Sequence, residues 1–426
     1  MIKNLLIRIM VVITLFSLKV NAQSNKCATM HHLQKSFTKD PTLKFKMIES
    51  EKAIQLWISN HKRNKKSSRE VIVIPTVVHV IWKDTIENVN DDQILSQIKV
   101  LNDDFRLMNA DSLNDKHPFW PFTIDADIEF CLAKQDPDGN PTNGITRTQT
   151  NVTAWDDNNS DNIKSTANGG RNNWDPTKYL NIYVVNLDGS TLGFATFPDE
   201  LTTQPNLDGV VIRYEAFGTE GTAGSGEFSA NDGGRTGTHE VGHWLNLRHI
   251  WADTICGNDF VADTEPAESA NYDCPTFPHK PNNQCGSGSN GEMYMNYMDY
   301  VDDKCMHMFT AGQSDRMHAT LNGPRSKLIT SIGCQLPTAL NEVNFLNAVA
   351  IYPNPNNGQF TISINLKNNS VVTASLINLV GATVKEFGVI SGEISNIDIT
   401  NFSTGVYYLK VSNSTTSTIK KVFITK

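Results

Sequence analysis

The sequence lacks both a long apolar run and a basic surplus. Outside the N-terminus, no segment is apolar enough to span a membrane, which takes about 20 residues. The 37 Lys and Arg residues are outnumbered by 45 Asp and Glu, giving a net charge of -8. Because phosphate binding needs a basic face, this balance argues against nucleic acid as the main partner. It gives mild support to bound cations such as calcium.

The only apolar run that resembles a membrane segment is short and lies at the N-terminus. Residues 9–18 form this run, and the basic residues Lys3 and Arg8 precede it. Residues 20–22 (Val-Asn-Ala) fit a small-residue cleavage site. The run is about half the length needed to span a bilayer. We therefore predict that residues 1–22 are a secretory signal peptide and that the mature form has no membrane span. A short membrane anchor is the alternative.

Cysteine is scarce, and its number is odd. Export permits disulfides, but an odd number leaves at least one cysteine without a partner within the chain. The seven cysteines are Cys27, Cys131, Cys256, Cys274, Cys285, Cys305 and Cys334. Four of them fall between positions 256 and 305, and three pairings of those four are possible.

Composition divides the rest of the chain into segments. Residues 23–68 are polar, with one helix-like stretch at 45–61, and end in a basic run without apolar content. Such a run is an accessible target for proteolysis, so we predict that residues 23–68 are a pro-segment. Residues 69–335 mix strands and helices without strict alternation, which indicates an α/β or α+β catalytic domain.

Pattern analysis predicts the elements of this domain. We expect strands at 71–82, 127–133, 180–187, 192–197 and 209–214, and helices at 90–108 and 236–247. Residues 218–237 read as a Gly- and Ser-rich loop, and residues 250–335 show little periodicity. After a linker at 336–347, residues 348–426 hold short alternating strands typical of a small all-β, Ig-like sandwich.

Two histidines at helical spacing indicate a metal site. His239 and His243 are four positions apart, so on a helix their imidazoles lie on one face and can hold one metal ion. Glu240 follows the first histidine, and its carboxylate can reach a water molecule bound to the metal. This pattern is typical of a zinc-dependent peptidase with Glu240 as the general base. A surface helix that happens to carry two histidines is the alternative.

A third histidine makes the site catalytic in character. His249 follows His243 by six positions, so the helix must stop near Asn246 to bring it back. Such a stop needs a left-handed residue, for which Asn is second only to Gly. Three histidines leave the fourth coordination position of zinc open for water.

These residues resemble the zinc signature of the metzincin metalloproteases, and residues 234–244 resemble its pappalysin branch. Residues 295–300 (Met-Asn-Tyr-Met-Asp-Tyr) and 305–313 are similar to the Met-turn region of that branch. The resemblance covers about residues 71–335. It implies a mixed, mostly parallel twisted sheet with an active-site helix. Asn246 departs from the pattern, because most members carry Gly there.

The resemblance also implies roles for residues near the zinc. Met298 would form the apolar floor beneath the metal, and Tyr300 would stabilise the reacting carbonyl, although plain packing is the alternative for each. Asp303 would lie at the base of the pocket for the residue after the scissile bond and favour Arg or Lys there. A solvated surface position is the alternative for Asp303.

The resemblance further implies two disulfides, Cys256–Cys285 and Cys274–Cys305. It implies a calcium-holding loop at residues 259–264, with Asp259, Asp263 and Thr264 as the oxygen ligands. An Asp-rich turn without calcium is the alternative for this loop.

Cys27 lies in the predicted pro-segment, where a cysteine of the family caps the zinc as a thiolate. The residue after it is Ala28, whereas the family carries Gly. The alternatives are a disulfide with Cys131 or Cys334, or an inert thiol. If the pocket prefers basic residues, self-cleavage would release a mature form that begins at or near Arg69.

The C-terminal residues resemble the sorting domain of the type IX secretion system of Bacteroidetes. The similarity lies in residues 351–358, 404–411 and 420–424. It implies passage through the periplasm and outer membrane, followed by release or attachment at the cell surface. A substrate- or cell-binding sandwich is the alternative.

Together these features predict a secreted, monomeric zinc endopeptidase that acts on proteins or peptides and uses the type IX machinery for export. One rival is a secreted adhesin or binding protein with a vestigial metal site. The other is a metal-dependent hydrolase with a non-peptide substrate.

Overall fold

The computed structural model describes residues 26–61, 69–282, 285–337, 348–365, 372–390, 393–413 and 417–426. The predicted signal peptide, residues 62–68 and most of the predicted linker lie outside these ranges. Five α-helices occur in the described part, and they are α1 (Thr29–Lys39), α2 (Leu43–Asn60), α3 (Asp91–Phe105), α4 (Arg235–Trp244) and α5 (Ala311–Leu321). None of the helices in the described ranges is both long and apolar enough to cross a membrane.

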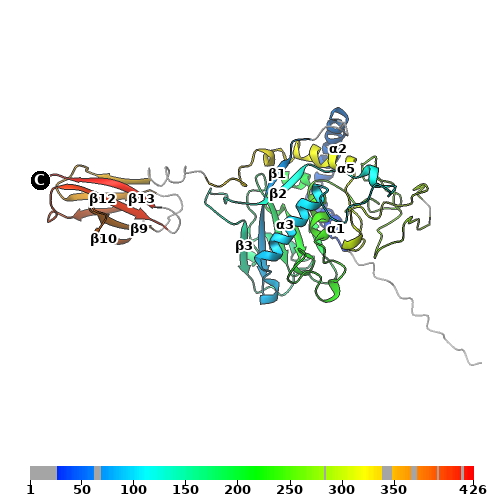
Figure 1. The fold of residues 1–426 in the computed structure, drawn as a ribbon, viewed down its shortest axis with the longest axis horizontal. Coiled ribbons are helices and arrows are strands. Elements are labelled where there is room, and N and C mark those ends of the chain that lie inside the picture. The colour runs from blue at the N-terminus through cyan, green and yellow to red at the C-terminus, as the bar shows by residue number, and fades with distance from the viewer. Residues whose placement is uncertain are drawn as a thin grey trace, which may run out of the picture.

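A six-stranded sheet forms the centre of the first domain (Figure 1). Its strands are β1 (Ile72–Trp82), β2 (Ile128–Leu132), β3 (Ile145–Gln149), β4 (Leu180–Val185), β5 (Gly193–Ala195) and β6 (Val210–Arg213). The order is β2-β1-β4-β6-β5, with β3 also paired to β1. Every pairing is parallel except that of β5 with β6. The mixed, mostly parallel sheet expected from the sequence is therefore confirmed.

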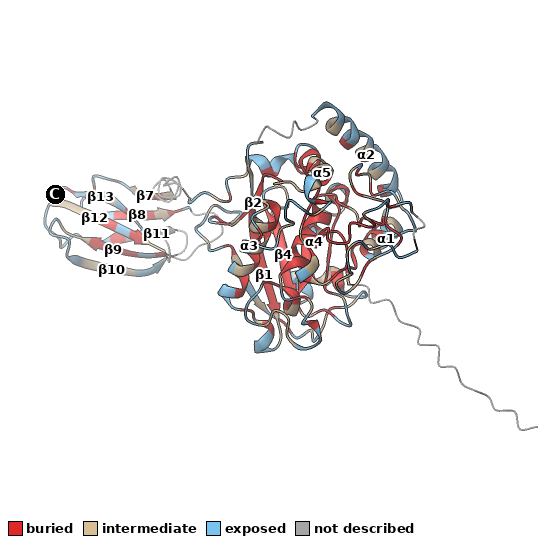
Figure 2. Cartoon of the chain, turned by 45° about the vertical axis from the view of Figure 1, so that its right-hand side comes forward, coloured by how far each residue is buried: buried red, intermediate tan, exposed pale blue. Residues whose placement is uncertain are grey.

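Two helices, α3 and α4, pack against this sheet, and α4 holds the predicted zinc ligands His239 and His243. α3 contacts β2, α4 contacts β5 and β6, and the two helices contact each other. The predicted stripe on α3 faces the core, since Ile94, Leu101 and Phe105 are fully buried. α4 is buried along its whole length and lies in the middle of the domain (Figure 2). Burial on all sides makes α4 rigid, as a catalytic centre requires.

Residues 250–335 contain a helix, α5, that pattern analysis missed. Thr310 caps its N-terminus by accepting a hydrogen bond from the Gln313 backbone, and the Gln313 side chain completes a capping box. Periodicity failed here because α5 buries polar side chains, including Ser314, Arg316 and His318, on faces that would otherwise identify it. Helix α1 and strand β3 were not predicted either.

The C-terminal segment folds into two antiparallel sheets that share one apolar core. Its strands are β7 (Val349–Tyr352), β8 (Gln359–Ile364), β9 (Val372–Ile377), β10 (Thr383–Ile390), β11 (Glu393–Asp398), β12 (Gly405–Ser412) and β13 (Ser417–Ile424). The sheet orders are β10-β9-β12-β13 and β11-β8-β7. The all-β sandwich is therefore confirmed.

A fully buried ion pair fixes the C-terminal end of α4. The Arg325 guanidinium donates to both carboxylate oxygens of Asp208, at 2.7 and 3.2 Å, and to the Trp244 carbonyl at 2.9 Å. Arg325 also lies 3.8 Å from the Trp244 ring centroid, and the Trp244 indole donates to Asp208 at 3.0 Å.

We predict that Arg325→Met lowers the free energy of unfolding by about 3–5 kcal/mol, because it leaves the buried Asp208 charge unpaired. Lys99→Met is the matched control. Lys99 pairs with Asp103 but is 73% exposed, so its loss should cost less than about 0.5 kcal/mol. Urea unfolding followed by tryptophan fluorescence measures both changes. Equal effects would show that the Asp208 pair does not hold the helix end.

Candidate metal centre

The active-site helix begins and ends at residues with left-handed backbone. Gly234 precedes α4 with φ 69°, and Asn246 follows it with φ 75°. The Leu247 amide donates to the Gly242 carbonyl at 2.9 Å, and the Asn246 amide donates to the His243 carbonyl at 2.8 Å. These two bonds form a Schellman motif with Asn246 in the position usually held by Gly. The chain therefore turns back where the sequence requires it to.

The turn brings the three predicted histidines together, and all of them are buried. The Nε2 atom of His243 lies 3.2 Å from Nε2 of His239 and 3.1 Å from Nε2 of His249. Each Nδ1 atom has its own acceptor. His239 bonds the Tyr297 carbonyl at 2.7 Å, His243 the Leu247 carbonyl at 2.8 Å, and His249 the Asp253 carboxylate at 2.8 Å.

This arrangement fits a metal ion. If each Nδ1 donates its proton to the acceptor beside it, the three Nε2 lone pairs face one another. Burial lowers the pKa of His239 to about 3 and holds that of His243 well below its usual value, which favours the neutral form of both rings. A tetrahedral zinc site with bonds of about 2.0–2.1 Å separates its nitrogens by roughly 3.3 Å. The observed separations are close to that value.

Glu240 lies beside the histidines with its carboxylate turned toward the N-terminal segment. Its Oε2 atom accepts hydrogen bonds from the Thr29 hydroxyl at 2.9 Å and the Cys27 thiol at 3.5 Å. Its Oε1 atom is buried without a partner. Burial raises the pKa of Glu240 to about 8, so this carboxyl can hold or release a proton near neutrality.

Cys27 completes the only group of at least three possible metal-ligating side chains found in the described ranges. Its sulfur and one nitrogen of each histidine all lie within 4.8 Å of one another. The backbone around Cys27 pairs with β5, since the Ala28 amide donates to Gly193 and the Leu192 amide donates to Lys26. The thiol is buried and forms no disulfide.

The structure places Met298 and Tyr300 beside the histidines. Met298 is fully buried, and its sulfur would be 2.5 Å from a Cβ atom added to Gly242, so it lies directly against α4. The Tyr300 ring centroid lies 4.9 Å from that of His249 and 5.7 Å from that of His239. The Tyr300 hydroxyl donates to the Cys27 carbonyl at 3.3 Å.

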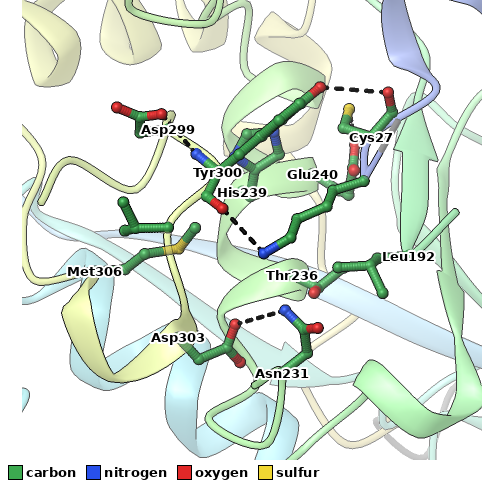
Figure 3. A pocket seen from close by; sticks show the side chains of 12 residues that line it. Cys27, Leu192, Asn231, Thr236, His239, Glu240, Asp299, Tyr300, Asp303 and Met306 are labelled. Atoms are coloured by element: carbon green, nitrogen blue, oxygen red, sulfur yellow. Dashed lines mark hydrogen bonds between the residues drawn. The ribbon is translucent and has the colours of Figure 1, made fainter. Parts of the chain in front are cut away.

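Next to this group is a pocket that Asp303 helps to line (Figure 3). Asp303 is buried and accepts hydrogen bonds from the amides of Gly233 and Arg235, at 2.9 and 3.1 Å, so it also caps the start of α4. Lys26 lines the same pocket, and its ammonium donates to the Tyr300 carbonyl at 3.0 Å. A basic side chain of the N-terminal segment therefore forms part of the pocket wall.

Three disulfides staple the domain. The structure pairs Cys256 with Cys285 and Cys274 with Cys305, as the resemblance implies. It also pairs Cys131 with Cys334, which links β2 to the end of the domain and excludes either as a disulfide partner of Cys27.

The proposed calcium loop is held by its own hydrogen bonds. Asp259 accepts bonds from the Thr264 hydroxyl and the Val261 amide. Asp263 accepts bonds from the Thr310 hydroxyl and the Gly312 amide, and so caps α5. Calcium at this loop stays a prediction.

Three contributors to the site were missed from sequence. Asp253 orients His249, and its spacing of four residues from that ligand is a usable signal. Thr29 and Lys26 flank Cys27, and no local pattern marks them, because their roles depend on the segment lying in the cleft.

We predict that Asn246→Gly keeps the metal and that Asn246→Val weakens it. A β-branched residue at φ 75° costs about 1–2 kcal/mol, which corresponds to roughly tenfold in zinc affinity. Chelator competition with zinc analysis of the purified chains measures the difference. Equal affinity in the two variants would mean that the turn does not position His249.

Comparisons with known proteins agree with this geometry. The family model described as pregnancy-associated plasma protein-A matches residues 161–322, and that of the secretion system C-terminal sorting domain matches residues 350–425. An extracellular metalloprotease of Sordaria macrospora is 38% identical over 153 residues. The match covers 35% of this chain and 50% of the relative, so the chain spans about half the length of that relative.

Solved structures of mirolysin are similar over nearly their whole length. Mirolysin bound to a compound is 47% identical, with a TM-score of 0.59, covering 63% of this chain and 99% of the other. A promirolysin mutant of Tannerella forsythia is 42% identical, with a TM-score of 0.63, covering 72% and 97%. The chain belongs to the pappalysin family of metzincin metalloproteases and carries a C-terminal secretion sorting domain.

Proposed function

We propose that the protein is a secreted zinc-dependent endopeptidase. The observation that carries this proposal is the convergence of three buried Nε2 atoms beside the carboxylate of Glu240, with that of His243 lying 3.1–3.2 Å from the other two. His239, His243 and His249 would hold the zinc ion.

Bound zinc supplies Lewis acidity and lowers the pKa of a water molecule to about 7. Glu240 would take a proton from the attacking water and later deliver it to the leaving amine. Its oxygens suit that work, because Oε1 has no partner and Oε2 bonds only side chains of the N-terminal segment. Departure of that segment would free both oxygens.

Tyr300 would bind the carbonyl of the scissile peptide. Its hydroxyl already donates to one peptide carbonyl, that of Cys27, next to the metal ligands. Met298 would support the histidines from below, because it packs against α4 at Gly242.

We infer a preference for Arg or Lys after the scissile bond. The pocket combines the Asp303 carboxylate with the Tyr300 carbonyl, and the contact of the Lys26 ammonium with that carbonyl supports a place for a basic side chain. A basic substrate residue would take the same place.

We also infer that the N-terminal segment keeps the protein latent. The Cys27 thiol faces Glu240, which would accept its proton as the sulfur binds zinc as a thiolate. Promirolysin matches 72% of this chain, whereas mature mirolysin matches 65%, which supports residues 23–68 as a pro-segment. Cleavage would then fall at or near Arg69, which now pairs with Asp315 at 2.6 Å.

The sorting domain supports export of the protein. The same proposal includes the type IX route to the cell exterior or surface. It also includes action as a monomer. Calcium at Asp259, Asp263 and Thr264 is part of it as well, supported by the hard oxygen ligands.

We predict that Glu240→Ala retains zinc but lowers kcat/KM by about 10²–10⁴-fold, because the general base is lost. Zinc analysis and digestion of a peptide library, each with and without a chelator, measure the two properties. A variant with unchanged proteolysis would contradict the mechanism. A wild-type chain that binds zinc but cleaves no peptide would favour the adhesin or the non-peptide hydrolase.

We predict that Asp303→Asn lowers cleavage before Arg and Lys by about tenfold relative to cleavage before neutral residues. The amide keeps one oxygen for the start of α4, so the fold should survive. Asp302→Asn, at the neighbouring position, is the control. The same library reports residue preference directly, and an unchanged preference would remove Asp303 from the pocket.

We predict that Cys27→Ala in the full chain is converted to the mature form, and becomes active, faster than the wild type, because the cleft loses its thiol cap. The time course of chain shortening and peptide cleavage measures this, and N-terminal sequencing should find Arg69 or a neighbour. Conversion at the wild-type rate would make Cys27 an inert thiol.

A further inference from the structure

We propose that Arg316, Arg248 and Phe260 form an anion-binding site, hereafter the arginine site, which Glu51 of the N-terminal segment fills in the latent chain. The proposal rests on the proposed function, because the site opens when residues 23–68 are removed. Its ligand class is a carboxylate or another small oxyanion.

Glu51 binds Arg316 as a ligand would. The Arg316 Nη1 and Nη2 atoms donate to the two Glu51 oxygens, at 2.8 and 2.6 Å. The Arg316 side chain is only 1% exposed, whereas that of Glu51 is 16% exposed. Gln55, one turn further along α2, donates to Glu51 at 2.8 Å and to the Phe260 carbonyl at 3.1 Å, which holds the carboxylate in place. The geometry is the paired fork typical of carboxylate recognition.

A second arginine, Arg248, adds positive charge to the arginine site. The guanidinium carbons of Arg248 and Arg316 lie 4.7 and 5.7 Å from the Phe260 ring centroid. Among the described residues, Arg248 forms no ion pair within 4.0 Å, and its buried Nε atom has no hydrogen-bond partner. Arginine keeps its charge in proteins, so two positive groups share one apolar ring and attract an anion.

Other carboxylates act on the two arginines electrostatically, as Asp199 does, but form no described ion pair with them. Asp253 bonds His249, Asp259 bonds Thr264, and Asp263 bonds Thr310. Among the described ion pairs, Glu51 is the sole acidic partner of Arg316. Loss of the N-terminal segment therefore leaves the fork of Arg316 without a carboxylate.

A hydrogen bond joins the arginine site to the turn that completes the metal centre. The Nε atom of Arg316 donates to the Asn246 carbonyl at 2.6 Å, in the turn that returns the chain to His249. Arg248 directly precedes that histidine in sequence. An anion at the arginine site would thus lie next to the turn that positions His249. An acidic side chain of a bound peptide and a free inorganic anion share the required chemistry.

Glu51→Ala in the full chain empties the site while both arginines stay. Isothermal titration with acetate, and separately with inorganic phosphate, should detect saturable binding to this variant. The wild type and Glu49→Ala should bind at least tenfold more weakly. Glu49 is the matched control because it lies on the same helix, is 72% exposed and pairs, among the described residues, with Lys52. Equal binding by Glu51→Ala and Glu49→Ala would overturn the proposal.

Adding Arg248→Gln to Glu51→Ala should weaken anion binding by about tenfold or more. If the second substitution leaves binding unchanged, the anion binds elsewhere and the proposal is overturned. Neither readout needs peptidase activity, so failure of the proposed function is seen separately, in the library digest. If Glu51→Ala does not fold, Glu51→Gln serves with the same controls.

In the mature chain, phosphate binding alone identifies a free anion. Faster cleavage of Glu-containing peptides that Arg248→Gln abolishes identifies a substrate side chain. Absence of both effects overturns the site in the mature form.

Discussion

Three imidazoles buried side by side form the constraint on which the rest of the catalytic domain depends. The Nε2 atom of His243 lies 3.1–3.2 Å from those of the other two, a spacing that a bound cation stabilises. Each ring is fixed through its Nδ1 atom by a different piece of chain: Tyr297 in the Met-turn region, Leu247 after the helix end, and Asp253 in the following loop. The metal centre therefore exists only if these pieces are held together.

Buried polar groups hold these segments of the chain together. Arg235, in the first turn of α4, donates to the Tyr297 hydroxyl at 2.7 Å and pairs with Asp104 of α3 at 2.7 Å. Arg325 fixes the other end of the same helix through Asp208. Such pairs are costly to bury and destabilising to break, which suits a framework that must keep one geometry.

The N-terminal segment is built onto this framework at three points. Lys26 lines the pocket beside Asp303, Cys27 faces the histidines and Glu240, and Glu51 binds Arg316 beside the Asn246 turn. Each contact uses a group that would otherwise meet a ligand or solvent. The same side chains would therefore hold the N-terminal segment in the latent chain and bind ligands in the active one.

Much of this was predictable from the sequence, and the remainder has physical reasons. Strand β1 and helix α3 follow clear β-branched and 3.6-residue patterns, and the Asn246 turn followed from the need to return His249 to the site. Helix α5 was missed because it buries polar residues such as Arg316, which hide its apolar face. The Arg316–Glu51 pair spans 265 positions, and no local pattern carries contacts of that kind.

The proposed function depends on a zinc ion held by three imidazoles and capped by Cys27 in the latent chain. X-ray absorption at the zinc edge tests it most directly. We predict three nitrogen ligands at about 2.0–2.1 Å and one sulfur at about 2.3 Å in the full chain. After conversion to the mature form, the sulfur should be replaced by oxygen. A latent chain without a zinc–sulfur bond, or with fewer than three zinc–nitrogen bonds, would contradict the account.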